Sequence, residues 1–150
     1  MNITASLLRA HGYSDLMAEK FERAWPDGVA VPVDEADCLA LAWQMRSLDC
    51  GMLDGLTCLL SEAEEQAIED KMAPLREEYN ATMAAEHAHL DADLAKLGPA
   101  YEYGPSSKHK AYKAKTRPIW GEYFATTTPI WIEFQRKEAL IIFNALQILA

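Results

Sequence analysis

The sequence lacks an apolar run of the roughly 18 to 20 residues that are needed to cross a bilayer. Its longest apolar stretch, residues 139–150, is interrupted by Asn144 and Gln147 and predicts a buried terminal helix instead. Residues 1–10 lack the basic and then apolar build of a secretory signal. We therefore expect a cytoplasmic protein without a membrane partner.

Motifs of nucleotide and nucleophile chemistry are also missing. The chain has no P-loop, no dinucleotide fingerprint and no G-x-S-x-G elbow. Its three cysteines, Cys38, Cys50 and Cys58, lack C-x-x-C spacing, which predicts free thiols in a reducing compartment. Cys50, next to Gly51, would be reactive at a helix start, but the apolar pattern favours buried structural cysteines. We predict that the protein is not an enzyme and has no catalytic residues and no cofactor.

Charge is distributed unevenly along the chain. The net charge is −9, while half of the residues are apolar, which is typical of a folded protein. Residues 1–60 carry a net charge of −5, residues 61–97 carry −7 and residues 98–150 carry +3. Because an acidic chain repels phosphate at long range, direct nucleic-acid binding is disfavoured unless the basic block acts alone.

Apolar residues recur at spacings of three and four residues, which predicts helices nearly throughout. Residues 29–33 could be extended, although a single short run cannot form a sheet. The four short helices expected in the first part of the chain are residues 3–10, a helix capped by Ser14 and ending near residue 24, a helix capped by Asp34 and ending near residue 46, and a weaker helix over residues 51–60.

The remainder of the chain predicts two long helices. Ser61 and Glu64 have the spacing of a capping box at the start of the first, and Gly98 with Pro99 is expected to end it. We predict an all-α fold in which the four short helices pack on a long, proline-kinked antiparallel helical hairpin. The parts of this single domain, residues 1–150, are a short-helix cap over 1–60, an acidic helix over 61–97, a turn over 98–106 and a kinked repeat helix over 107–150.

An eleven-residue repeat extends from Pro74 to the last residue. Its units are PLREEYNATMA, AEHAHLDADLA, KLGPAYEYGPS, SKHKAYKAKTR, PIWGEYFATTT, PIWIEFQRKEA and LIIFNALQILA. The sixth place holds Tyr79, Leu90, Tyr101, Tyr112, Tyr123, Phe134 and Ala145, and the second holds Leu75, Glu86, Leu97, Lys108, Ile119, Ile130 and Ile141. These places are four residues apart and share one helix face. Since eleven residues fill three turns at about 3.67 residues per turn, the stripe stays on one side of a nearly straight helix.

Prolines begin several of these units. Pro118 and Pro129 begin two consecutive units, and Pro74 begins a looser copy. A proline inside a helix removes a hydrogen bond and clashes with the preceding turn, at a cost of about 3 kcal/mol. We expect the helix to kink or to restart at each proline, with Thr128 able to cap the last segment.

The units PLREEYNATMA, PIWGEYFATTT and PIWIEFQRKEA resemble the tandem P-[LI]-x-x-E-[YF] repeats of small uncharacterised proteins of bacteriophages and prophages. The resemblance covers about the second half of the chain. The units AEHAHLDADLA and KLGPAYEYGPS depart from it, because they lack the proline, glutamate and aromatic residue in place. The resemblance implies a phage accessory protein in the cytoplasm of a host cell. It implies no chemistry and no catalytic residues.

Residues of metal-ligand type gather near the middle of the chain. They are His87, His89, His109, Glu86, Asp91 and Asp93. Glu86 and His89 have the i, i+3 spacing of di-iron helix bundles, but the chain has no second Glu-x-x-His. We interpret these residues as solvated helix residues and predict no metal site.

A basic segment, residues 101–117, interleaves tyrosines with cations. Tyrosine and lysine together can stack on bases and neutralise phosphates. The candidate nucleic-acid contacts are Lys108, Lys110, Lys113, Lys115 and Arg117. The alternative is that these cations face Glu86, Asp91 and Asp93 across the turn, which would also explain why opposite charges flank it.

Two sets of residues are candidates for partner binding. The carboxylates Glu62, Glu65, Glu69 and Asp70 could occupy a basic groove meant for nucleic acid, although a merely soluble helix surface explains the same charges. Trp120 and Trp131 could anchor a partner, because tryptophan is enriched at interface hot spots. Packing of both tryptophans beneath the short helices is the alternative.

The leading hypothesis is a non-enzymatic, phage-encoded binding protein that inhibits a host defence or nucleic-acid-handling complex, with an anti-CRISPR role as its most concrete form. Its partner would be a host protein complex. One alternative is a structural, coiled-coil-like protein whose repeat drives self-association into a homodimer. A second is a small nucleic-acid-binding module that uses residues 108–117.

Overall fold

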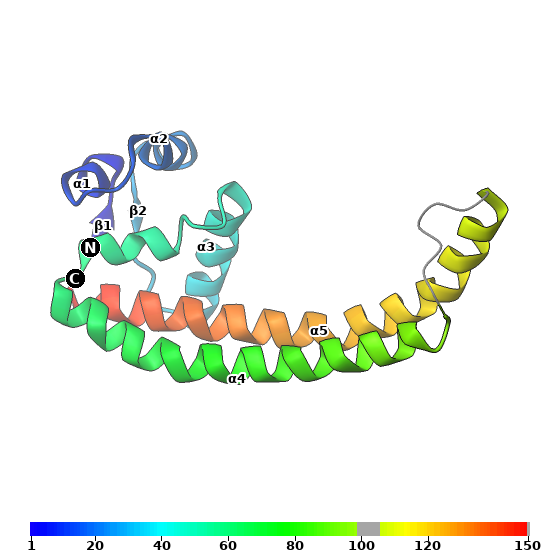
Figure 1. The fold of residues 1–150 in the computed structure, drawn as a ribbon. Helices are drawn as coiled ribbons and strands as arrows, with labels where there is room; N and C mark the ends of the chain where they lie inside the picture. Colours follow the sequence, from blue (N-terminus) through cyan, green and yellow to red (C-terminus); the bar gives the residue numbers. More distant parts are fainter. Residues whose placement is uncertain (99–105, 150) are drawn as a thin grey trace. The chain divides into compact units, whose positions relative to one another are not determined.

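The structure, a computed structural model, describes residues 1–98 and 106–149. Helices dominate this part of the chain (Figure 1), which confirms the all-α class. In chain order the elements are β1 (Asn2–Ile3), α1 (Ala5–Ala10), α2 (Asp15–Ala24), β2 (Val29–Ala30), α3 (Glu35–Leu48), the 3-10 helix η1 (Asp54–Leu59), α4 (Glu62–Ala95) and α5 (Ser106–Ile148). Among the described helices, none has the length and apolar character that a membrane span requires.

The chain divides into two compact units. Unit 1 comprises Met1–Pro74 together with Gln135–Ala150, and unit 2 comprises Leu75–Phe134. Helix α4 passes from unit 1 into unit 2 after Pro74, and α5 passes back after Phe134. Whether the chain acts as a single domain stays a prediction.

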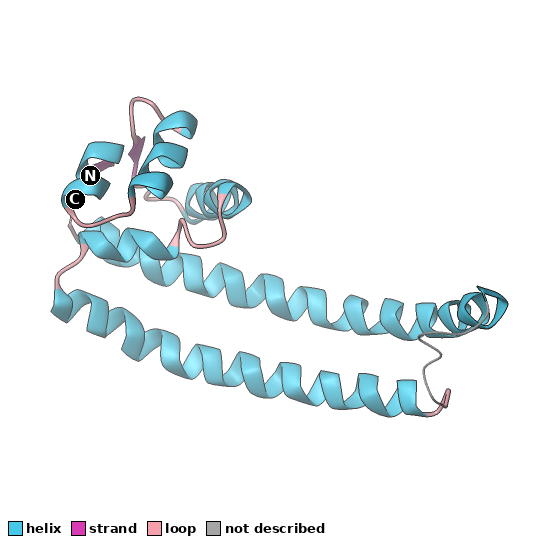
Figure 2. Cartoon of the chain, turned by 45° about the horizontal axis from the view of Figure 1, so that its top comes forward, coloured by secondary structure: helices cyan, strands magenta, loops and turns pink. Residues whose placement is uncertain are grey.

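Unit 1 contains a small sheet that the sequence analysis did not expect. Strand β1 pairs antiparallel with β2, with Ile3 opposite Val29 (Figure 2, magenta). Gly28 precedes β2 at a φ of +80°, and a Cβ there would lie 2.5 Å from the carbonyl oxygen of Ile3. Only glycine therefore fits this turn without strain. The expectation that the extended run could form no sheet is wrong, because residues 2–3 supply the partner strand.

Side-chain caps set where the short helices begin. Ser14 accepts from the Met17 N–H at the start of α2, and Asp34 accepts from the Ala36 N–H at the start of α3, which confirms both predicted caps. Thr4 caps α1 in the same way. The first helix therefore begins at residue 5, and the expected start at residue 3 is wrong because that residue belongs to β1.

The segment after α3 forms a 3-10 helix, which is tighter than the expected α-helix. Gly55 in η1 packs directly against Tyr13, since a Cβ there would lie 2.1 Å from Cε2 of the tyrosine ring. The Tyr13 hydroxyl donates a 3.0 Å hydrogen bond to the carbonyl of Met52. Burial raises the pKa of Tyr13 to about 12.

The end of α5 lies in the core of unit 1. Ala139, Ile142, Phe143 and Leu146 are all buried there, which confirms the predicted buried terminal helix. They belong to the same hydrophobic cluster as the buried residues of α1, α2 and α3. An apolar face that packs into this core thus explains why the stretch is rich in aliphatic residues.

Parts of α4 and α5 run antiparallel in unit 2. The rings of Tyr79 and Phe134 stack with centroids 4.4 Å apart. One repeat later along α4 and one repeat earlier along α5, Leu90 and Tyr123 line the same hollow, together with Ile119. All of these residues occupy second or sixth places of the eleven-residue unit. These members of the stripe therefore form the seam between the two helical segments.

Three prolines lie inside helices. Pro74 is within α4, and Pro118 and Pro129 are within α5. Because α5 is one helix from Ser106 to Ile148, the expected alternative of a restart at each proline is wrong. Thr128 is an exposed residue of the helix interior and caps nothing.

Candidate functional site

The first turn of α4 carries the predicted capping box. The backbone N–H of Ser61 donates to the Glu64 carboxylate over 2.8 Å, and the N–H of Glu64 donates to the Ser61 hydroxyl over 3.4 Å. Both bonds satisfy backbone donors that a helix start leaves free. The same backbone bond from Ser61 lowers the pKa of Glu64. The capping box is confirmed.

Behind this cap, the four candidate carboxylates of unit 1 are exposed. Glu62, Glu65 and Glu69 are spaced by three and four residues, so they lie on one face of α4. Asp70 is beside them and accepts a 2.9 Å hydrogen bond from Gln66. The arrangement presents negative charge to solvent. It fits a partner-binding surface and a soluble helix surface alike, so the assignment stays a prediction.

The two candidate tryptophans are partly exposed. The exposed fraction is 39% for Trp120 and 41% for Trp131. Trp120 stacks on Phe124, with ring centroids 5.7 Å apart and planes inclined by 28°. Phe124 is 55% exposed and was not among the predicted partner-binding residues. Its position four residues after Trp120 was the signal that could have found it.

The basic segment is solvent-exposed in α5. Lys110, Lys113, Lys115 and Arg117 are all exposed. Among the described residues, none of them forms an ion pair with an acidic side chain. The acidic residues have other neighbours, since Asp93 pairs with Lys96 at 2.6 Å and Glu86 lies 3.9 Å from His89. The side chain of Lys108 and the tyrosines Tyr101 and Tyr103 lie outside the described residues.

His87 joins the two helical segments of unit 2. Its Nδ1 lies 2.8 Å from the carbonyl oxygen of Met83, and its Nε2 lies 3.0 Å from the hydroxyl oxygen of Tyr123. A neutral ring with its proton on Nδ1 donates to the carbonyl and accepts from the tyrosine hydroxyl. In the sequence this histidine is a candidate metal ligand, and no sequence pattern signals its bond across the two helices.

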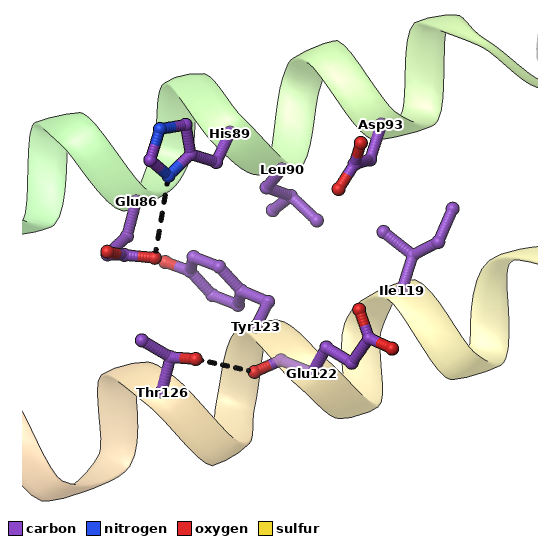
Figure 3. A pocket seen from close by; sticks show the side chains of 8 residues that line it. All are labelled: Glu86, His89, Leu90, Asp93, Ile119, Glu122, Tyr123 and Thr126. Atoms are coloured by element: carbon purple, nitrogen blue, oxygen red, sulfur yellow. Dashed lines mark hydrogen bonds and ion pairs between the residues drawn. The ribbon is translucent and has the colours of Figure 1, made fainter.

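A polar hollow of about 150 Å³ opens beside this contact (Figure 3). It is lined by Glu86, His89, Leu90, Asp93, Ile119, Glu122, Tyr123 and Thr126. Figure 3 shows His89 turned toward Glu86, and the hydroxyl of Thr126 bonded to the carbonyl of Glu122. In residues 1–98 and 106–149, no three His, Cys, Asp or Glu side chains converge in a way that could hold a metal ion.

The cysteines are free thiols, as expected. Cys38 is buried, and its burial raises the pKa of its thiol. Cys58 is partly buried and its thiol pKa is raised for the same reason. Cys50 is exposed in the turn after α3, so the prediction that it is buried is wrong. Helix α3 ends at Leu48, which leaves Cys50 beyond its apolar face.

Comparisons with protein-family models, with curated proteins and with solved structures find no match for this chain.

Proposed function

We propose that this chain is a non-enzymatic, phage-encoded binding protein that inhibits a host defence or nucleic-acid-handling complex, in the manner of an anti-CRISPR protein. The observation that carries the proposal is the exposed row of Glu62, Glu65 and Glu69, with Asp70 beside it, at the start of α4. Carboxylates spaced along a helix offer a basic groove the charge pattern of a nucleic-acid backbone. The repeat units carry the phage assignment through their resemblance to small phage proteins.

The start of α4 supports binding of a partner through complementary charge. Helix α4 begins with a capping box, which holds its first turn in place and so holds the spacing of the following carboxylates. Glu62 and Glu65 also sit in the first turn, where negative charge is stabilised by the helix dipole. A preformed row of charge costs less ordering on binding than a flexible acidic tail would.

The proposed arrangement of the whole chain is the one expected from the sequence. In it, four short helices pack on a long, proline-kinked antiparallel hairpin within one domain. The stacking of Tyr79 on Phe134 supports the antiparallel pairing of the two long helices. A long paired rod would carry much surface for a partner to cover.

The test is affinity capture of a host complex with the chain of residues 1–150. Glu62→Gln, Glu65→Gln and Asp70→Asn together should abolish capture, because the partner groove loses its countercharges. The matched control is Glu77→Gln, Glu78→Gln and Asp91→Asn, which removes the same charge from other exposed positions of α4. Free nucleic acid should also displace the protein from the captured host complex.

Either of two results would remove the proposal. The first is that the triple variant at Glu62, Glu65 and Asp70 captures the host complex as well as the control variant does. The second is a protein that retains no host complex and sediments as a homodimer, which would favour the structural, self-associating alternative.

A further inference from the structure

Five exposed side chains share one face of α5 within unit 2. They are Lys110, Lys113, Arg117, Trp120 and Phe124, at successive spacings of three, four, three and four residues. This spacing keeps side chains on one side of a helix. At 1.5 Å per residue the set extends over about 21 Å. We call it the cation–aromatic strip.

The two halves of the strip have different chemistry. Its three cations form no ion pair with acidic side chains in the part of the chain that the structure describes, so none of those carboxylates neutralises their positive charge by direct pairing. Its two rings stack on each other and are 39% and 55% exposed. Stacked aromatic rings with this much exposed area still offer flat apolar surface to a ligand.

Space beside the strip is open. Ala114, Gly121 and Ala125 follow one edge of it and are all exposed. A Cβ added at Gly121 would meet nothing within 4 Å. The nearest acidic residue on the same stretch of α5, Glu122, lines the hollow on another face of the helix. Nothing on this stretch of α5 therefore blocks access to the strip or cancels its charge.

We propose that the cation–aromatic strip binds single-stranded nucleic acid. Lys110, Lys113 and Arg117 would contact phosphates, and unpaired bases would stack on Trp120 and Phe124. Phosphate and base together use both halves of the strip, and stacking on aromatic side chains beside cations is how single strands are bound without sequence preference. The proposal uses a different surface from the acidic row of α4, so failure of the proposed function would not refute it, and its own failure would not refute the proposed function.

Two other occupants fit the strip less well. An acidic peptide would pair with the three cations and leave the exposed rings unused. An anionic membrane surface favours aliphatic residues next to aromatic ones, whereas the small neighbours at positions 114, 121 and 125 are alanine and glycine. The net charge of −9 also opposes a whole-molecule approach to an anionic membrane.

The experiment measures binding of the full chain to a labelled polythymidine of about 12 nucleotides by fluorescence anisotropy, at several salt concentrations. Three phosphate contacts predict that log K falls with log salt at a slope of about −2. Lys113→Gln should reduce the steepness by about 0.7. The matched control Lys115→Gln removes an exposed cation from another face of α5 and should leave affinity and slope nearly unchanged.

The aromatic half is tested by its own variants. Trp120→Ala should weaken binding by roughly 5- to 150-fold without changing the salt slope, because a stacking contact releases no counterion. Gly121→Glu should abolish binding by placing a carboxylate beside the strip, while Gly121→Gln, of equal size, should bind like the native protein. Both Gly121 variants add a side chain in open space, so loss of folding does not explain a difference between them.

Several outcomes would overturn the proposal. They are absence of oligonucleotide binding at about 50 mM salt, equal losses for Lys115→Gln and Lys113→Gln, and native affinity in Trp120→Ala. Binding to vesicles of anionic lipid in place of the oligonucleotide would assign the strip to a membrane surface. If an acidic peptide displaces the oligonucleotide, and Trp120→Ala does not change the affinity for that peptide, the strip would be assigned to a protein partner.

Discussion

Replacing Arg46 with methionine should strongly destabilise unit 1, because it leaves a buried carboxylate without its cation. Arg46 on α3 lies 2.6 Å from the Glu138 carboxylate on α5, and both side chains are only 11% exposed. The guanidinium also donates a 3.0 Å hydrogen bond to the carbonyl of Gln135. The Glu138 carboxylate also accepts a longer, 3.4 Å hydrogen bond from the Gln135 amide, which carries no charge to replace that of Arg46.

The expected magnitude follows from the burial of the pair. Removing the arginine of a buried ion pair costs about 3 to 5 kcal/mol, since the carboxylate stays buried without that countercharge. A pair at the surface would cost only about 0.2 to 1 kcal/mol. For a chain of this length, 1 kcal/mol shifts the melting temperature by about 2 to 4 °C. We therefore expect a decrease of roughly 6 to 20 °C.

The double variant Arg46→Met with Glu138→Leu is the control. It removes both charges and keeps apolar volume, so its stability should return to within about 2 kcal/mol of the native protein. Urea unfolding followed by far-UV circular dichroism measures both changes. A single-variant cost under about 1 kcal/mol would refute the burial argument. A double variant as unstable as the single one would attribute the loss to packing of the arginine stem rather than to charge.

Two further predictions concern Tyr13 and the glycines of the helices. Gly55→Ala should lower the free energy of unfolding by about 1 to 3 kcal/mol, because its Cβ would overlap the Tyr13 ring. Gly121→Ala adds a methyl group in open space and should raise the free energy of unfolding by about 0.5 to 1 kcal/mol. Thermal unfolding measures both changes. Because the folded state holds the Tyr13 proton to about pH 12, while the unfolded state releases it near the ordinary pKa of 10, the stabilisation is complete below pH 10 and is lost as the pH rises toward 12. A pH series of unfolding midpoints should show this loss in the native protein and not in Tyr13→Phe; an equal loss in both would contradict the assignment.

Local sequence signals predicted much of the helical structure. The sequence predicted the caps Ser14 and Asp34 and the capping box at Ser61, because each of these hydrogen bonds joins residues within four positions of one another. The buried end of α5 was readable because its apolar spacing repeats over several turns. The stripe of second- and sixth-place residues was readable for the same reason, and in unit 2 it forms the seam.

The errors arose where distant residues decide the structure. Strand β2 exists because residues 2–3 pair with it across the intervening two helices, which no local pattern signals. The bond of Arg46 to Glu138 joins positions 92 residues apart. The restart at Pro118 and Pro129 was expected from the local cost of proline, but α5 continues through both. Of the candidate site, the exposure of the carboxylates and cations could be foreseen, while the stacking of Phe124 on Trp120 was missed.

The repeated seam has a consequence for how the helices of unit 2 find their alignment. Sliding α5 by one eleven-residue unit would place Tyr123 opposite Tyr79, where Phe134 stacks now, so an aromatic ring would again meet an aromatic ring. A periodic contact surface thus tolerates a slip of three turns without losing its character. The choice of alignment must come from places where the repeat changes its chemistry, and Ile119 in the hollow is one, because a slip by one unit would put Lys108 in its place.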